Sequence, residues 1–405
     1  MLTILYPHLL PTVHSFPVGL LVVMPVDAER PILIVKGMKE AILAARVKRS
    51  FAVYVAPVRV DDVASIALIT AFFDVPNEPL IVRSPLFAED DHSRRLVSLL
   101  QAPEIDVHFF DEHAREMLAY RSQMSIPAVT RKRLEQAQFG NYSHSVWRGV
   151  DDQMQSWFSG RTEADDLEVI RVQLGESLMP EDVAVIDAIG AGNTYVGADP
   201  VSSAFLVRHE PGPLQEHDIA LLLQRIFPPE QIIKGALRVY DREEVADILV
   251  VTDHSLIFIQ AKDSPNTEQV LANPLSRKRA TAHKSLKKAL AQLRGAIRYA
   301  RRQDPMPLVI GGQQLTLKLA GRQWRAVAVV KELFNDEFAG YSPPVLQLAK
   351  ETGVPCVALD YAELNMYTAN LSSEELFIAA IDKVFSVGEA RGELPRLRIG
   401  PTEAE

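Results

Sequence analysis

Two apolar runs separated by a short polar turn constrain the fold of this chain most strongly. Residues 246–252 and 256–262 are rich in β-branched side chains, and three polar residues lie between them. This pattern predicts a β-hairpin with a short loop. Because strand side chains alternate, Gln260 and Lys262 project from the same face of the second strand. Asp247 begins the partner strand, so the pattern predicts that an acid, an amide and a lysine converge at one end of the hairpin.

Length and composition set the scale of the molecule. A chain of 405 residues is too long for one ordinary domain, which predicts two or three domains at roughly 100–200 residues each. Hydrophobic residues make up 47% and charged residues 23%, which excludes a disordered or fibrous chain. The single Cys356 excludes a disulfide scaffold and a cysteine-rich zinc site, and it favours a reducing compartment.

Alternating patterns predict an α/β fold class for the first part of the chain, residues 1–124. A middle segment, 125–210, is expected to be helical in part, at 131–138 and 151–158. A turn around Pro211 and Gly212 indicates a boundary, followed by a second domain over 211–390 and a tail over 391–405. In the first domain, strands are expected at 31–35, 51–60, 78–82 and 105–110, and helices at 38–47, 60–73 and 91–100.

One segment is strongly basic although the net charge is −9. Residues 277–302 contain ten basic side chains and no acid. Leu286, Leu290, Leu293 and Ile297 recur at helical spacing, which predicts an amphipathic helix with a cationic face. A solvated surface helix is the alternative. The candidates for contact with DNA phosphates are Lys284, Lys287, Lys288, Arg294 and Arg298.

The residues at the end of the hairpin are suited to one kind of chemistry. A carboxylate with further oxygen donors binds a hard divalent cation such as Mg²⁺ or Mn²⁺. A nearby lysine can neutralise the charge that develops on a phosphate. The basic helix begins within about twenty residues of Lys262, so it could hold a nucleic-acid backbone. This combination indicates metal-assisted hydrolysis of phosphodiester bonds.

Asp247 and, thirteen positions later, Gln260-Ala261-Lys262 resemble the motif of the PD-(D/E)xK nucleases. The match is to the variant of the Mrr-like restriction endonucleases, in which glutamine replaces the second acid, and it covers roughly residues 212–385. The resemblance implies a restriction-endonuclease-like α/β core with a mixed sheet and a divalent-metal site. This chain has Ala246 in place of the motif's proline.

The resemblance also implies a role for each matching residue. Asp247 would be the principal metal ligand, Gln260 the second, and the carbonyl of Ala261 a third. Lys262 would be the catalytic lysine, and Glu216 would be the acid of the preceding helix, with Asp218 as its alternative. Because Gln260 is neutral, the site holds less negative charge and is expected to bind metal more weakly.

We therefore expect a Mg²⁺- or Mn²⁺-dependent endodeoxyribonuclease that acts in defence against foreign DNA or in DNA maintenance. RNA is not excluded as a partner, and a homodimer is plausible because cutting both strands needs two sites. The main alternative is a non-catalytic nucleic-acid-binding or assembly protein that keeps a nuclease-like fold. A third class, an acidic protein that binds a basic partner, follows from the net charge but conflicts with the basic helix.

Several weaker signals have plain structural explanations. Residues 190–194 resemble a phosphate-binding loop, but we expect an ordinary turn. His108, Asp111 and His113 could bind a metal, but surface positions are favoured. Three acids precede the hairpin and are expected either to be exposed or to add a carboxylate to the site: Asp241, Glu243 and Glu244. Glu332 could face the same cleft. Cys356 is expected in the core.

The N-terminal segment, residues 1–26, contains four prolines and no lysine or arginine. It lacks the charged start and the continuous apolar centre of a signal peptide. The chain has no run of roughly 18 apolar residues, so no membrane span is predicted. These features predict a cytoplasmic protein.

Overall fold

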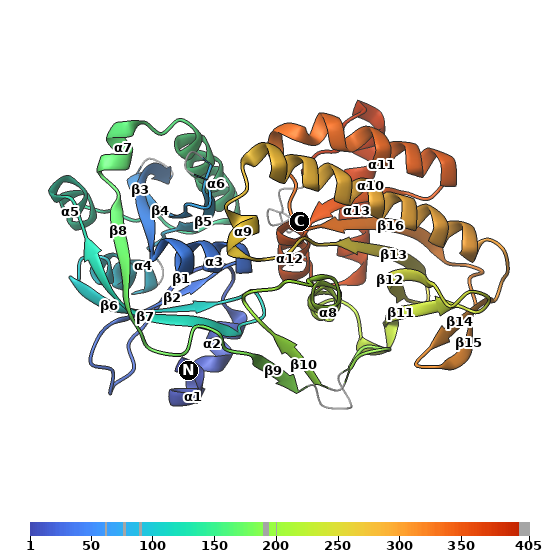
Figure 1. Cartoon of the computed structure of the whole chain (residues 1–405). Helices are drawn as coiled ribbons and strands as arrows, with labels where there is room; N and C mark the ends of the chain where they lie inside the picture. Colours follow the sequence, from blue (N-terminus) through green and yellow to red (C-terminus); the bar gives the residue numbers. More distant parts are fainter. Residues whose placement is uncertain (61–62, 76–77, 89–90, 189–193, 200, 397–405) are drawn as a thin grey trace.

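The computed structural model describes residues 1–405 except 61–62, 76–77, 89–90, 189–193, 200 and 397–405. Two large sheets lie side by side, and each is flanked by helices (Figure 1). The first has eight strands in the order β1-β2-β6-β7-β8-β3-β4-β5, and the second has seven in the order β15-β14-β11-β12-β13-β16-β17. The expected α/β fold class is therefore confirmed.

Strands of the first sheet come from both sides of residue 124. Strand β2 pairs in parallel with β6, and the other neighbouring strands pair antiparallel. Its strands are β1 (Gly19–Val23), β2 (Ile32–Lys36), β3 (Ser50–Val60), β4 (Val63–Phe72), β5 (Leu80–Pro85), β6 (Glu104–Phe110), β7 (Glu116–Ser125) and β8 (Ile170–Ser177). The helices of this half are α1 (Leu2–Leu5), α2 (Leu10–Ser15), α3 (Lys39–Lys48), α4 (Asp91–Leu99), α5 (Ala128–Glu135), α6 (His144–Ser159) and α7 (Glu163–Leu167), and a 3₁₀ turn forms over Pro7–Leu9.

The prediction of a helix over residues 60–73 is wrong. This segment forms strand β4, which pairs with β3 on one side and with β5 on the other. Nearly all of its side chains are buried, so an apolar run without a polar face could not distinguish a covered strand from a buried helix. The pairing with distant strands determines its conformation.

The middle segment, expected to stand between two domains, contributes a strand to the first sheet. Strand β8 lies between β7 and β3 and pairs antiparallel with both. The two expected helices of this segment correspond to α5 and α6, and α6 packs on β3 and β5. Two short strands of the segment, β9 (Val185–Ala188) and β10 (Val201–Ala204), form a small antiparallel ribbon.

The second sheet is mixed, as expected. Strands β12 and β13 form the predicted antiparallel hairpin, whereas β13, β16 and β17 are parallel. Its strands are β11 (Ile232–Arg238), β12 (Glu244–Val251), β13 (Ser255–Lys262), β14 (Met306–Ile310), β15 (Gln313–Leu317), β16 (Gln323–Val330) and β17 (Cys356–Asp360). Its helices are α8 (Gly212–Leu223), α9 (Glu268–Leu271), α10 (Leu275–Ala300), α11 (Phe338–Thr352), α12 (Tyr361–Asn370) and α13 (Glu374–Arg391), with 3₁₀ turns at Pro229–Gln231 and Asn335–Glu337.

Helix α10 covers one face of this sheet and confirms the predicted amphipathic helix. Its four regularly spaced apolar residues, from Leu286 to Ile297, are buried against β12, β13 and β16. Burial of such a stripe supplies most of the stability of a surface helix. Helix α11 lies beside α10. None of the helices in the described part of the chain combines the length and the apolar character that a membrane span requires.

Buried ion pairs join the two halves of the molecule, the first built on the eight-stranded sheet and the second on the seven-stranded sheet. Asp218 of α8 accepts hydrogen bonds from Arg115, which precedes β7 in the first half, at 2.8 Å and from Arg208 at 2.7 Å. All three side chains are almost completely buried. Lys39 and Asp263 form a second ion pair between the halves, at 3.1 Å. Since buried charges are tolerated only when they are paired, these contacts fix α8 against the first half.

Replacing Asp218 with asparagine is expected to destabilise the protein by about 3–5 kcal/mol, because two arginines would stay buried without their counter-charge. The exposed Asp91, which pairs with Arg95 within α4, provides the matched control. Asp91→Asn is expected to change stability by less than about 0.5 kcal/mol. Urea unfolding of both variants measures the difference, and similar small effects would contradict the assigned role of Asp218.

Candidate functional site

The site predicted from the hairpin lies where β12 and β13 separate. Regular pairing of the two strands ends at Ile248 and Ile259. At the next position, Asp247 Oδ2 accepts a hydrogen bond from the backbone N–H of Ala261 at 2.7 Å. The carboxylate thus takes the place of a backbone acceptor. Asp247 is only 2% exposed, and Oδ1 makes no hydrogen bond with the residues that the structure describes.

Lys262 lies directly beside this carboxylate. Its Nζ atom is 3.3 Å from Asp247 Oδ2 and donates to the carbonyl oxygen of Ala261 at 2.7 Å. The side chain is 25% exposed, so the ammonium group remains accessible to a ligand. The Ala261 carbonyl, expected to assist in metal binding, instead holds the lysine in this structure.

Gln260 is 2% exposed and follows the last paired rung of the hairpin, opposite Asp247. Its amide nitrogen is buried and has no hydrogen-bond partner among the described residues. A buried amide nitrogen without a partner costs about 1–3 kcal/mol, and a bound ligand is one way to satisfy it. A half-turn about the last side-chain bond would present the amide oxygen instead.

Glu216 reaches this region from α8. Its Oε2 atom lies 3.9 Å from Nζ of Lys234 on β11. Burial and the nearby charge of Asp247 raise the pKa of Glu216 to about 7. The structure therefore brings Glu216 near Asp247, Gln260 and Lys262.

Asp218, the alternative to Glu216 as the acid from the helix, does not belong to this site. It lies in the ion pairs with Arg115 and Arg208 described above. Successive helical residues are separated by about 100°, so positions 216 and 218 point in nearly opposite directions. Only Glu216 can face β12 while Asp218 contacts the first half.

The donors at this site are of the chemical type that a hard divalent cation prefers. Asp247 Oδ1, the Glu216 carboxylate and the Gln260 amide oxygen are oxygen ligands of the kind that Mg²⁺ and Mn²⁺ prefer. Two carboxylates that lie near each other in a partly buried place repel each other. A cation bound between them relieves this repulsion. Lys262 can then interact with a phosphate held by the same cation.

The proposed DNA-binding residues of α10 do not lie at this site. Four of them, Lys284, Lys287, Lys288 and Arg298, are exposed. They lie on the side of the helix opposite the buried stripe, so they point away from the sheet. Arg294 is ion-paired with Glu351 at 2.7 Å. The helix thus offers a separate cationic surface.

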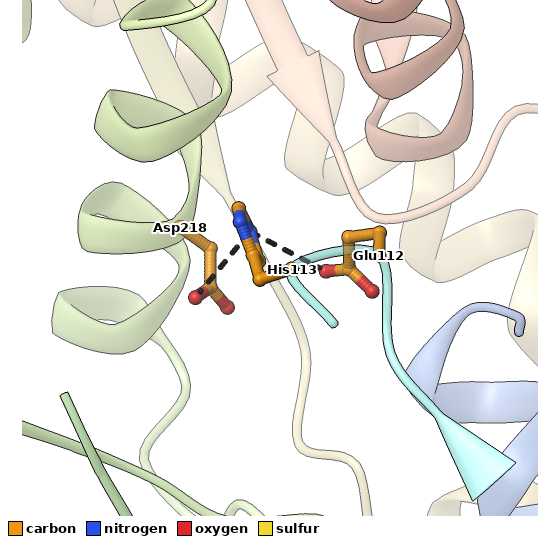
Figure 2. A group of neighbouring side chains, drawn as sticks. All are labelled: Glu112, His113 and Asp218. Carbon is orange, nitrogen blue, oxygen red and sulfur yellow. Dashed lines mark ion pairs between the residues drawn. The ribbon is translucent and has the colours of Figure 1, made fainter. Parts of the chain in front are cut away.

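A second group of polar side chains lies between the halves, where Glu112, His113 and Asp218 approach one another (Figure 2). His113 Nε2 is 3.8 Å from Glu112 Oε1 and 3.7 Å from Asp218 Oδ1. Surface positions were expected for His108, Asp111 and His113, and this expectation is wrong. The loop after β6 packs between the halves, so its polar residues are buried or nearly so.

This second group could hold a metal ion by its spacing, but Asp218 is already paired with two arginines. Both oxygens of Asp218 accept from arginines, which hold its pKa well below the usual value despite burial. Burial and Arg115 lower the pKa of His113 well below its usual value, which favours the neutral ring. Tyr361 donates to Glu112 at 2.7 Å, joining α12 to the first half. We interpret the group as part of the contact between the halves.

The remaining expectations have different outcomes. Cys356 is completely buried, which confirms a core position. Asp241, Glu243 and Glu244 are exposed by area. Glu332 lines a hollow between the halves with Lys278 and Asp74, and Asp247 does not line that hollow. The glycines and Asn193 of the suspected phosphate-binding loop lie outside the described residues.

No family model, curated protein or solved structure matches this chain.

Glu216 should make stability depend on pH. Its folded pKa of about 7 lies above its ordinary value of 4.5, so the folded state binds the proton more tightly than the unfolded chain does. The cost of ionising Glu216 therefore grows as the pH rises from about 4.5 through 7. Glu216→Gln removes this cost and should stabilise the protein at pH 8 by on the order of 1–3 kcal/mol, with no gain at pH 4.

Urea unfolding at the two pH values measures this effect. Glu230→Gln, at an exposed position after α8, is the control and should show no such difference. An equal change in the stability of Glu216→Gln at both pH values would contradict the raised pKa.

Proposed function

We propose that this protein hydrolyses phosphodiester bonds of DNA with the help of Mg²⁺ or Mn²⁺. The observation that carries the proposal is the convergence of Asp247, Gln260, Lys262 and Glu216 at the separated end of the β12–β13 hairpin. Their order and types match the nuclease motif, and their oxygen atoms suit a hard cation. Defence against foreign DNA or DNA maintenance is the setting that the resemblance suggests.

Each side chain has a distinct role in this proposal. A divalent cation, when bound, would polarise the phosphate and acidify a water molecule. Asp247 and Glu216 would supply the charged ligands, and Gln260 a neutral one. The Lys262 ammonium, held by the Ala261 carbonyl, lies where it can neutralise charge on a phosphate oxygen.

A non-catalytic nucleic-acid-binding protein is the second candidate, and the charges of the site favour it in one respect. The Lys262 ammonium already lies against Asp247, and Gln260 carries no charge. The site therefore attracts a cation less strongly than one built from two free carboxylates. In that case the exposed basic surface of α10 would carry the function.

Cleavage of plasmid DNA distinguishes the two candidates. Purified protein with Mg²⁺ or Mn²⁺ should nick or cut supercoiled DNA, and EDTA should stop the reaction. Asp247→Asn should abolish cleavage, and Lys262→Met should reduce the rate at least about 100-fold while leaving DNA binding nearly unchanged.

The matched controls are Asp253→Asn and Lys318→Gln, which alter exposed side chains outside the site. Both should cleave as the wild type does. Cleavage that survives Asp247→Asn would contradict the assigned site, and binding without any cleavage would favour the second candidate.

Binding to duplex DNA should depend on the α10 surface. Replacing Lys284, Lys287 and Lys288 together with glutamine should weaken affinity and lower the slope of log affinity against log salt by about 2 to 3. The control set replaces three exposed basic residues of the first half, namely Lys48, Arg131 and Lys132. Equal losses for the two sets, measured by fluorescence anisotropy, would show that α10 is not a specific interface.

A further inference from the structure

A β-bulge turns a third acid, Glu244, toward the same side of the sheet as Asp247. On β11 and β12, Ala236 pairs with Ala246, but the next residue, Leu237, pairs with Glu244. Val245 is therefore an extra residue in β12. In a regular strand, side chains three positions apart point to opposite faces, and one inserted residue restores them to the same face.

The position of Glu244 agrees with this register. Its Oε1 atom lies 3.8 Å from the place where a Cβ on Gly235 would be, and Gly235 has a φ of +63°. A glycine at this position tolerates the left-handed conformation and leaves room for the carboxylate. Glu244 thus lies beside Gly235 of β11, and part of its side chain stays exposed.

Three acids and two lysines lie within electrostatic reach of one another. Glu216 and Glu244 are each near the charges of Asp247, Lys234 and Lys262. When all five groups are ionised, three negative charges face two positive ones, so a net charge of −1 remains.

A second observation supports a ligand at this cluster. The amide nitrogen of Gln260 is buried without a partner one residue beyond the last rung of the hairpin, beside Asp247. Glu216, by contrast, already lies 3.9 Å from Lys234. The site therefore combines an unsatisfied polar group, excess negative charge and an internal cation that a ligand can displace.

We propose that Glu244 is the third carboxylate of a divalent-cation site formed with Glu216 and Asp247, and that Lys234 is the internal counter-ion that competes with the cation. The inference rests on the proposed function for the location of the site and its class of ligand. It adds two residues that the nuclease-like motif does not assign. Removing Glu244 should weaken cation binding, whereas removing the charge of Lys234 should strengthen it.

Mn²⁺ binding to the full-length protein tests this pair of opposite effects. Titration followed by electron paramagnetic resonance at pH 8, without nucleic acid, gives the dissociation constant. Glu244→Gln should raise it at least about tenfold. Glu243→Gln, which removes the neighbouring exposed carboxylate that pairs with Arg238, is the matched control and should leave it unchanged.

Lys234→Gln should lower the Mn²⁺ dissociation constant several-fold, because it removes a positive charge from the immediate neighbourhood of Glu216. A merely structural role of this lysine would predict weaker binding instead. Urea midpoints of all variants show whether each protein is folded before binding is compared.

The possible outcomes separate this inference from the proposed function. Equal Mn²⁺ affinity of Glu244→Gln and Glu243→Gln overturns the role of Glu244, provided that Asp247→Asn still weakens binding. A dissociation constant raised by Lys234→Gln overturns the role of Lys234. The predicted shifts in a protein that cleaves no DNA would support the cation site and contradict only the nuclease activity.

Discussion

The pairing of Asp218 with two buried arginines is the interaction on which the arrangement of the site depends. A charged helix residue that is almost completely buried must face its counter-charges, so α8 has only one acceptable rotation about its axis. That rotation turns Glu216, two residues earlier, toward β11 and β12. The same ion pairs therefore fix both the contact between the halves and the geometry of the candidate site.

The rest of the site forms where the β12–β13 hairpin stops pairing regularly. Where β12 and β13 separate, the side chain of Asp247 satisfies the N–H of Ala261 in place of a backbone carbonyl. This substitution lets the strands diverge without leaving a buried donor unpaired. It also leaves one carboxylate oxygen free to bind a ligand. The bulge at Val245 extends the same opening toward Glu244.

Local patterns predicted the elements that their own sequence determines. The hairpin and the amphipathic α10 have a periodicity or composition that specifies one conformation. Strand β4 was expected as a helix, since its residues are apolar on every side and only pairing with β3 and β5 defines it. The place of β8 between β7 and β3 also depends on contacts distant in sequence.

The candidate site was predictable to a similar degree. Asp247, Gln260 and Lys262 could be placed together because alternation in paired strands is a local rule. Burial of the loop from Asp111 to Arg115 could not be predicted, since its charges are balanced by residues about a hundred positions away, Arg208 and Asp218. The position of Glu244 near Asp247 could not be predicted, because no sequence pattern marks the bulge that redirects its side chain.

A crystal structure with bound Mn²⁺, located by its anomalous scattering, tests the central claim most directly. One strong peak is expected within coordination distance of Asp247 Oδ1 and the carboxylate of Glu216. No peak is expected at Glu112, His113 and Asp218, because arginines already pair with Asp218. A Mn²⁺ ion bound at that second group, with none at Asp247, would contradict the account.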